Sequence, residues 1–143
     1  MDDYTKLGST SEGLLLAADG TLTDLGKVGS HPYLRPHAMS GSRIVGRAHG
    51  SGDDNGFLWQ GGVLTDLGTF IPTDINTAGD VVGTVDSVAH VMRDGVLTDL
   101  NSLLPSGSGW VLTNANGIND SGRVVGSGTI GGVTRGFVMD LCD

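Results

Sequence analysis

Four side chains that could do chemistry crowd into one short segment, GSHPYLRPHAMSGS from Gly29 to Ser42. Two imidazoles, a phenol and a guanidinium fall within seven residues there, at His31, Tyr33, Arg35 and His37. Because side chains alternate along a strand, these odd positions would share one face. Such a face could bind an anion or a carbonyl oxygen, or transfer protons near neutral pH. The simpler interpretation is a proline-rich loop with solvated polar groups.

Two more residues complete the candidate ligand-binding set, His49 and Trp110. Trp110 follows a Gly-Ser loop and could stack on a sugar or another planar ligand, although core packing is the more common fate of tryptophan. The four histidines, together with Asp53 and Asp54, show no recognised spacing of metal ligands, so we predict no metal site. The chain has no Gly-x-Ser-x-Gly nucleophile motif. It also has no phosphate-binding loop that opens a helix, and we predict no cofactor.

The charge balance limits the partners that the chain can attract. Its 143 residues carry a formal net charge of −8, and charged residues make up only 17% of the sequence. Attraction to nucleic acid or to anionic lipid is therefore disfavoured, and we expect neither as a partner. The single cysteine, Cys142, excludes an intrachain disulfide.

The N-terminus also bears on location. The opening MDDYTKLGST is acidic and polar, where a secretory signal would be basic and then apolar. We expect a cytoplasmic protein for the chain as given, and an extracellular one if a leader has been removed.

An internal repeat organises the sequence. Three elements recur in a fixed order: an apolar strand, a Leu-Thr-Asp-Leu segment after a short turn, and a segment ending in Val-Val-Gly or Ile-Val-Gly. The apolar strands are GLLL, GFLW, AHVM and GFVM, and the Leu-Thr-Asp-Leu segments begin at Leu22, Leu64 and Leu97. The third element is MSGSRIVG, INTAGDVVG and INDSGRVVG. Such internal periodicity is the signature of a repeat architecture.

The composition of these elements predicts β-structure. Short runs of Val, Ile, Leu and Thr are bounded by Gly, Asn and Asp, and Asp19-Gly20 and Asp94-Gly95 are strong hairpin signals. Gly79 and Gly122 stand where a turn needs a positive φ. With 25 glycines and no helical period over ten residues, the chain is predicted to be all-β.

The succession GFLWQGGVLTDLGTF, INTAGDVVGTV and AHVMRDGVLTDL resembles the HAF repeat family, which occurs in probable extracellular repeat proteins of bacteria. The likeness runs from about Gly13 to Leu141. It implies a repetitive, propeller-like β fold and implies little about activity.

The repeats divide one domain, 1–143, into blades of four short antiparallel strands. Two complete blades are predicted at 38–68 and 74–100, a partial blade at 13–26 supplies the last two strands, and a partial blade at 115–141 supplies the first three. Three blades cannot close a ring. We therefore expect a homodimer that forms a six-bladed ring, in which the TLTDL strand of one chain completes the C-terminal blade of the other. A closed single-chain β-barrel is the structural alternative.

Residues that recur at equivalent positions are predicted to be structural. Asp24, Asp66 and Asp99 each end a strand, where a carboxylate can accept backbone N–H groups of the next turn. Asn76 and Asn119 can satisfy backbone groups ahead of a glycine turn. Function is therefore expected where one repeat differs from the others, as in the segment that holds His31 and His37.

Two classes of function remain open. The first is a noncatalytic module that binds a small ligand or a protein at the loop-lined mouth of the ring. The second is a small cofactor-free enzyme, a cyclase, isomerase or lyase, that acts on an oxygen-rich small molecule with a His/Arg/Tyr pocket.

Overall fold

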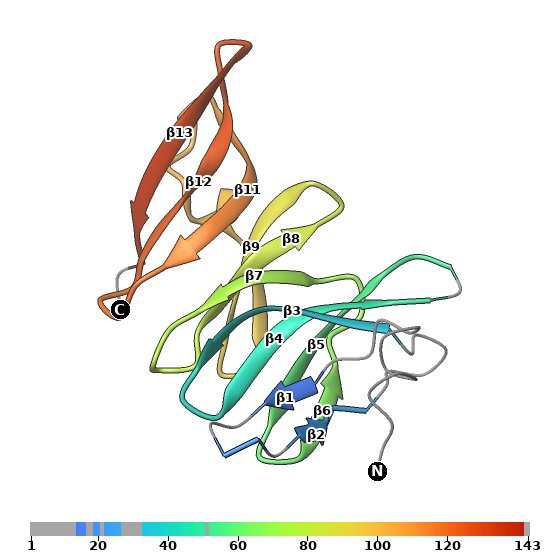
Figure 1. Ribbon diagram of the computed structural model, residues 1–143. Helices are drawn as coiled ribbons and strands as arrows, with labels where there is room; N and C mark the ends of the chain where they lie inside the picture. The colour runs from blue at the N-terminus through green and yellow to red at the C-terminus, as the bar shows by residue number, and fades with distance from the viewer. Residues whose placement is uncertain (1–13, 17–18, 21, 27–32, 51, 142–143) are drawn as a thin grey trace.

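The computed structural model describes residues 14–16, 19–20, 22–26, 33–50 and 52–141 (Figure 1). Regular structure in this part of the chain is β-strand, apart from one short 3₁₀ helix, η1 (Leu100–Leu103). The prediction of an all-β protein is confirmed. Short β-branched and aromatic runs between glycine turns favour strands over helices, and such runs occur in each of the described sheets.

The strands form three antiparallel sheets of four, four and three strands, and a two-stranded hairpin precedes them. The hairpin consists of β1 (Leu14–Leu16) and β2 (Leu22–Asp24). The first sheet contains, in order, β3 (Tyr33–Ser40), β4 (Arg43–His49), β5 (Asn55–Gln60) and β6 (Val63–Asp66). The second contains β7 (Ile71–Ile75), β8 (Val81–Val85), β9 (Val88–Arg93) and β10 (Val96–Asp99), and the third contains β11 (Trp110–Ile118), β12 (Arg123–Ile130) and β13 (Val133–Asp140).

The single-chain barrel that the sequence left open is wrong. Each sheet is an open up-and-down ladder, in which strands that follow one another in sequence are neighbours in space. Within the described residues no sheet closes on itself, because tight hairpins keep each group of strands together and the next group begins a new layer. The sheets follow one another in chain order in Figure 1.

A β-bulge recurs at the same place in the first strand of every sheet. Register shifts lie between Pro36 and Ala38, between Pro72 and Asp74, and between Ala115 and Gly117. The bulged residues are therefore His37, Thr73 and Asn116. A bulge bends its strand and increases the local twist.

The glycine that ends each Val-Val-Gly or Ile-Val-Gly segment lies opposite this bulge. A Cβ added to Gly83 would collide with the carbonyl oxygen of Ile71, and Gly46 and Gly126 face the same kind of collision in their own sheets. The repeat keeps glycine here because the backbone of the neighbouring strand occupies the space of a side chain.

Three apolar clusters hold the layers together. Phe57 and Trp59 of the first sheet pack with Leu25, which follows the hairpin. Val45 of the first sheet packs with Val81 of the second. Val82 of the second sheet packs in turn with Val124 of the third, so the core runs between successive sheets rather than inside one closed shell.

The last leucine of each Leu-Thr-Asp-Leu segment lies in one of these clusters. Leu25 belongs to the cluster of the first sheet, Leu67 packs against the cluster between the first and second sheets, and Leu100 is buried between the second and third. Each of these leucines thus packs where its own unit meets the following sheet.

An ion pair recurs with its charges exchanged between two sheets. Arg93 Nε at the end of β9 lies 3.4 Å from Asp80 Oδ2, just before the start of β8. At the equivalent place in the third sheet, Arg123 Nε donates to Asp140 Oδ1 at 2.7 Å. The arginine and the aspartate have exchanged strands, but the cross-strand complementarity is the same.

Candidate functional site

Strand β3 contains most of the candidate segment. Tyr33, Arg35 and His37 all lie in β3, so the strand interpretation holds for them and the loop interpretation does not. His31 lies outside the described residues. Antiparallel pairing with β4 places one residue of β4 opposite Tyr33 and another opposite Arg35.

Tyr33 and Arg35 each lie opposite a polar residue of β4. Tyr33 is paired with His49, and their ring centroids are 6.4 Å apart. Arg35 is paired with Arg47. Directly opposed residues of an antiparallel pair share a face, so two guanidinium groups, a phenol and an imidazole gather on one side of the first sheet. We call these four residues the cationic cluster.

Asp54 connects two members of this cluster. His49 Nδ1 lies 2.7 Å from Asp54 Oδ1, and Arg47 Nε lies 3.4 Å from Asp54 Oδ2. Because a carboxylate only accepts, the proton of this hydrogen bond belongs to Nδ1, which leaves Nε2 of His49 for another partner. The side chains of His49 and Arg47 are about half exposed, so a ligand in solution can reach them.

A groove of about 470 Å³ adjoins the cluster between the first and second sheets. It is lined by Arg47, Gly52, Asp53, Asp54, Thr69, Ile71, Thr84 and Asp86. The loop after β4 and the turn after β8 both reach it, so segments of successive sheets converge there. One guanidinium, three carboxylates and two hydroxyl groups line the groove, so an anionic oxygen is favoured only at its Arg47 end, beside the cationic cluster.

His37 takes a different position from its neighbours. It is the bulged residue of β3, and its Nδ1 lies 3.0 Å from the carbonyl oxygen of Pro72 in the second sheet. Thr73, the bulged residue of that sheet, donates from Oγ1 to the carbonyl oxygen of Ala115 in the third. His37 thus makes a contact between sheets that the repeat makes again with a different side chain.

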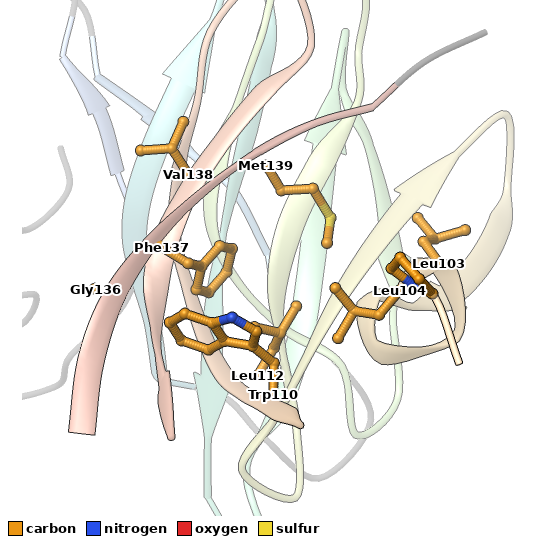
Figure 2. A pocket seen from close by; sticks show the side chains of 9 residues that line it. Leu103, Leu104, Trp110, Leu112, Gly136, Phe137, Val138 and Met139 are labelled. Atoms are coloured by element: carbon orange, nitrogen blue, oxygen red, sulfur yellow. The ribbon is translucent and has the colours of Figure 1, made fainter. Parts of the chain in front are cut away.

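Trp110 lies far along the chain from the cationic cluster, in the third sheet. It is half-buried against the core cluster of that sheet, and it also lines an apolar pocket of about 490 Å³. Figure 2 shows Trp110 and Phe137 around this pocket with Met139, and with Leu103 and Leu104 across from them. The structure therefore separates the predicted residues into a polar group near β3 and β4 and an apolar one beside β13.

The repeated acids and amides at Asp66, Asp99, Asn76 and Asn119 bind backbone groups, as the sequence predicted, and the side chain of Asp24 lies outside the part of the chain that the structure describes. Asp66 accepts from the backbone N–H of Gly68 and Asp99 from that of Asn101, both at 2.8 Å. Asn76 Oδ1 accepts from the N–H of Asp80, and Asn119 Oδ1 accepts from the N–H of Arg123. Gly79 and Gly122 have φ values of 89° and 83° in the same turns.

Two carboxyl groups with a shifted pKa belong to the third sheet rather than to the groove. The backbone N–H of Thr77 donates to Asp120 Oδ1 at 2.9 Å and lowers the pKa of Asp120 below its usual 3.8. The hydrogen bond from Arg123 lowers the pKa of Asp140 in the same direction. In each case the donor stabilises the charged carboxylate.

Comparison of the repeats could have found one site residue that sequence reasoning missed. Arg47 follows Gly46, at the position where the other repeats have Thr84 after Gly83 and Ser127 after Gly126. Arg47 therefore departs from the other repeats at its position, as the segment around His37 does. The other lining residues, Thr69 and Asp86, carry no comparable signal because the stacking of two sheets brings them to the groove.

No helix in the described part of the chain is long and apolar enough to cross a membrane. Comparison of the chain with protein-family models, with curated proteins and with solved structures finds no match.

Proposed function

We propose that this chain is a noncatalytic binding module of the HAF repeat type, which recognises a small ligand through carboxylate or carbonyl oxygens. The ligand is held over the cationic cluster on the exposed face of β3 and β4, at the Arg47 end of the groove between the first two sheets. In this proposal the sheets are blades of a propeller-like ring of six, to which two chains contribute three blades each. The antiparallel four-stranded sheets and their stacking in chain order support that arrangement.

The pairing of Arg35 with Arg47 carries the binding part of the proposal. Like charges directly opposite each other on neighbouring strands are destabilising. Asp54 offsets part of this repulsion at Arg47. A bound carboxylate would offset the rest, and it would gain charge-assisted hydrogen bonds with the guanidinium groups.

The direct test is a titration with citrate, followed by amide chemical shifts and by calorimetry. Replacing Arg35 or Arg47 with Gln should weaken citrate binding by roughly tenfold or more, because each change removes a hydrogen bond to a charged group. Arg135→Gln is the matched control, since Arg135 is an exposed cation of β13 and should not affect affinity. Absence of citrate binding, or equal affinity in all three variants, would refute the site.

One contact favours the enzymatic alternative. The 2.7 Å hydrogen bond between His49 and Asp54 orients an imidazole whose second nitrogen could act as a base. A probe for this activity is the exchange of the methyl protons of pyruvate in D₂O, followed by proton NMR. Exchange above the rate of buffer alone that is lost in His49→Gln would favour an enzyme, and exchange at the buffer rate would leave the binding module.

A further inference from the structure

The outer face of the third sheet exposes a row of valines. Val125 of β12 and Val138 of β13 are directly opposite each other and are 43% and 65% exposed. Val111 of β11 lies on the same face and is also exposed. An apolar surface of this kind on a sheet usually marks a contact with another element.

The repeat shows what covers this position in the other sheets. Val45 and Val82 precede glycine in the Ile-Val-Gly and Val-Val-Gly segments as Val125 does, and both are fully buried against the following sheet. Val91 occupies the position of Val138 in the second sheet and is 2% exposed. The exposed valines thus stand at positions that form the interface between sheets elsewhere in the same chain.

The edge of β13 lacks the fourth strand that the other two sheets have at the equivalent place, within the described residues. In the first sheet β5 is paired with β6, and in the second β9 is paired with β10. Within the described residues, β13 is paired only with β12. An exposed edge of this kind offers a row of backbone donors and acceptors to another strand.

The apolar pocket of Figure 2 lies between η1 and the third sheet, and it reaches β13 from Gly136 to Met139. In the two complete sheets, the first leucine of Leu-Thr-Asp-Leu is opposite the residue equivalent to Met139: Leu64 is opposite Trp59, and Leu97 is opposite Met92. Leu64 packs against the core cluster of its own sheet. Met139, Phe137 and Leu103 line the corresponding space beside β13, which has the chemistry to take a leucine.

We infer that a second copy of this chain covers the exposed valines of the third sheet and pairs with the edge of β13. Its β2 adds antiparallel to the edge of β13, with Leu22 opposite Met139 and Asp24 opposite Phe137. Its first sheet covers Val125 and Val138. The interaction is a β-augmentation in which backbone hydrogen bonds provide affinity and the pocket selects the leucine.

The position of Leu25 favours a second copy over an unrelated strand. Leu25 follows β2 directly and is 3% exposed in the cluster of the first sheet, with Ile44 and Trp59. A β2 strand seated on β13 therefore places its own first sheet over the outer face of the third. Within the described residues, the hairpin would give up the three residue pairs that β1 and β2 share. If each chain donates its β2 to the other, the contact closes with two-fold symmetry.

This contact specifies the dimer of the proposed ring but does not depend on the citrate site. Sedimentation velocity should show a dimer for the wild type and a monomer for Val138→Glu. Val96→Glu is the matched control, because Val96 is 63% exposed on β10 of a complete sheet and should leave the dimer intact. Circular dichroism reports whether each variant is folded, and citrate affinity reports the state of the citrate site. Failure of the dimer contact can therefore be distinguished from failure of the citrate site.

A synthetic peptide of residues 19–26, DGTLTDLG, provides a second measurement. It should compete for β13, shift the amide resonances of Val138 and Met139, and convert dimer to monomer, whereas a scrambled peptide should not. A larger assembly that Val138→Glu disperses would support the same contact. A wild type that stays monomeric, or an assembly that resists both Val138→Glu and the peptide, would overturn the inference.

Discussion

His37 of the first sheet and Pro72 of the second are joined by a hydrogen bond of 3.0 Å from Nδ1 to the carbonyl oxygen. Because a carbonyl oxygen only accepts, Nδ1 carries the proton. Thr73 makes the equivalent bond to Ala115. The bulge therefore does more than bend a strand, since it aims one side chain at the backbone of the following sheet.

Removing this bond should destabilise the fold without unfolding it. His37→Ala should lower the free energy of unfolding by about 1 kcal/mol, the usual net value of one hydrogen bond. His37→Thr should lose less, since threonine makes this contact in the second sheet. Urea denaturation of both variants checks the prediction, and equal losses would show that the bond to Pro72 is not what His37 contributes.

Gly83 should tolerate no side chain. A Cβ there would collide with the carbonyl oxygen of Ile71, so Gly83→Ala should cost about 1–3 kcal/mol through backbone displacement. Gly136→Ala is the control, because its Cβ would meet Gly126 O at an ordinary 3.6 Å. Thermal unfolding of the two variants should separate them clearly, and similar melting temperatures would contradict the steric explanation.

Asp99 should stabilise the end of its repeat as a cap. It accepts from the backbone N–H of Asn101 at 2.8 Å and from the Asn101 side chain at 3.0 Å, at the start of η1. Asp99→Ala should cost about 0.5–2 kcal/mol, as for other caps, and Asp99→Asn should retain most of the stability. Chemical denaturation provides the values, and an alanine variant as stable as the wild type would refute the cap.

Acid should weaken two interactions of carboxylates: the bond from Thr77 to Asp120 between the second and third sheets, and the Arg123–Asp140 pair within the third sheet. The pKa values of Asp120 and Asp140 lie below 3.8 in the folded chain, so their contribution is present above that pH and is lost as pH falls through the folded values. Carbon-detected NMR titration should find both groups titrating below 3.8. Arg123→Gln should return the pKa of Asp140 toward its usual value and leave that of Asp120 unchanged, and a shift of both would contradict the assigned donors.

Local chemistry explains which features the sequence could predict. Asp94 and Gly95 both have positive φ, at 52° and 78°, in the tight turn between β9 and β10. Asp66 reaches a backbone N–H only two residues away. Both features depend on neighbours in sequence, so residue types were enough to predict them.

The site depends on pairings that residue types do not encode. Arg47 enters the cationic cluster because β4 is paired with β3 in one register, and Thr84 reaches the groove because the second sheet packs on the first. The bulge at His37 follows from the same register. These are long-range consequences of packing, and a one-residue slip would change the face of each side chain.

Repeats of similar sequence carry a risk of pairing with the wrong partner while the chain folds. The exchanged ion pairs oppose two such errors. If β12 paired with β9 instead of β13, Arg123 would lie opposite Arg93, and if β8 paired with β13, Asp80 would lie opposite Asp140. Like charges at these positions would penalise the misfolded ladders, so the sign of one charge identifies the correct partner for each strand.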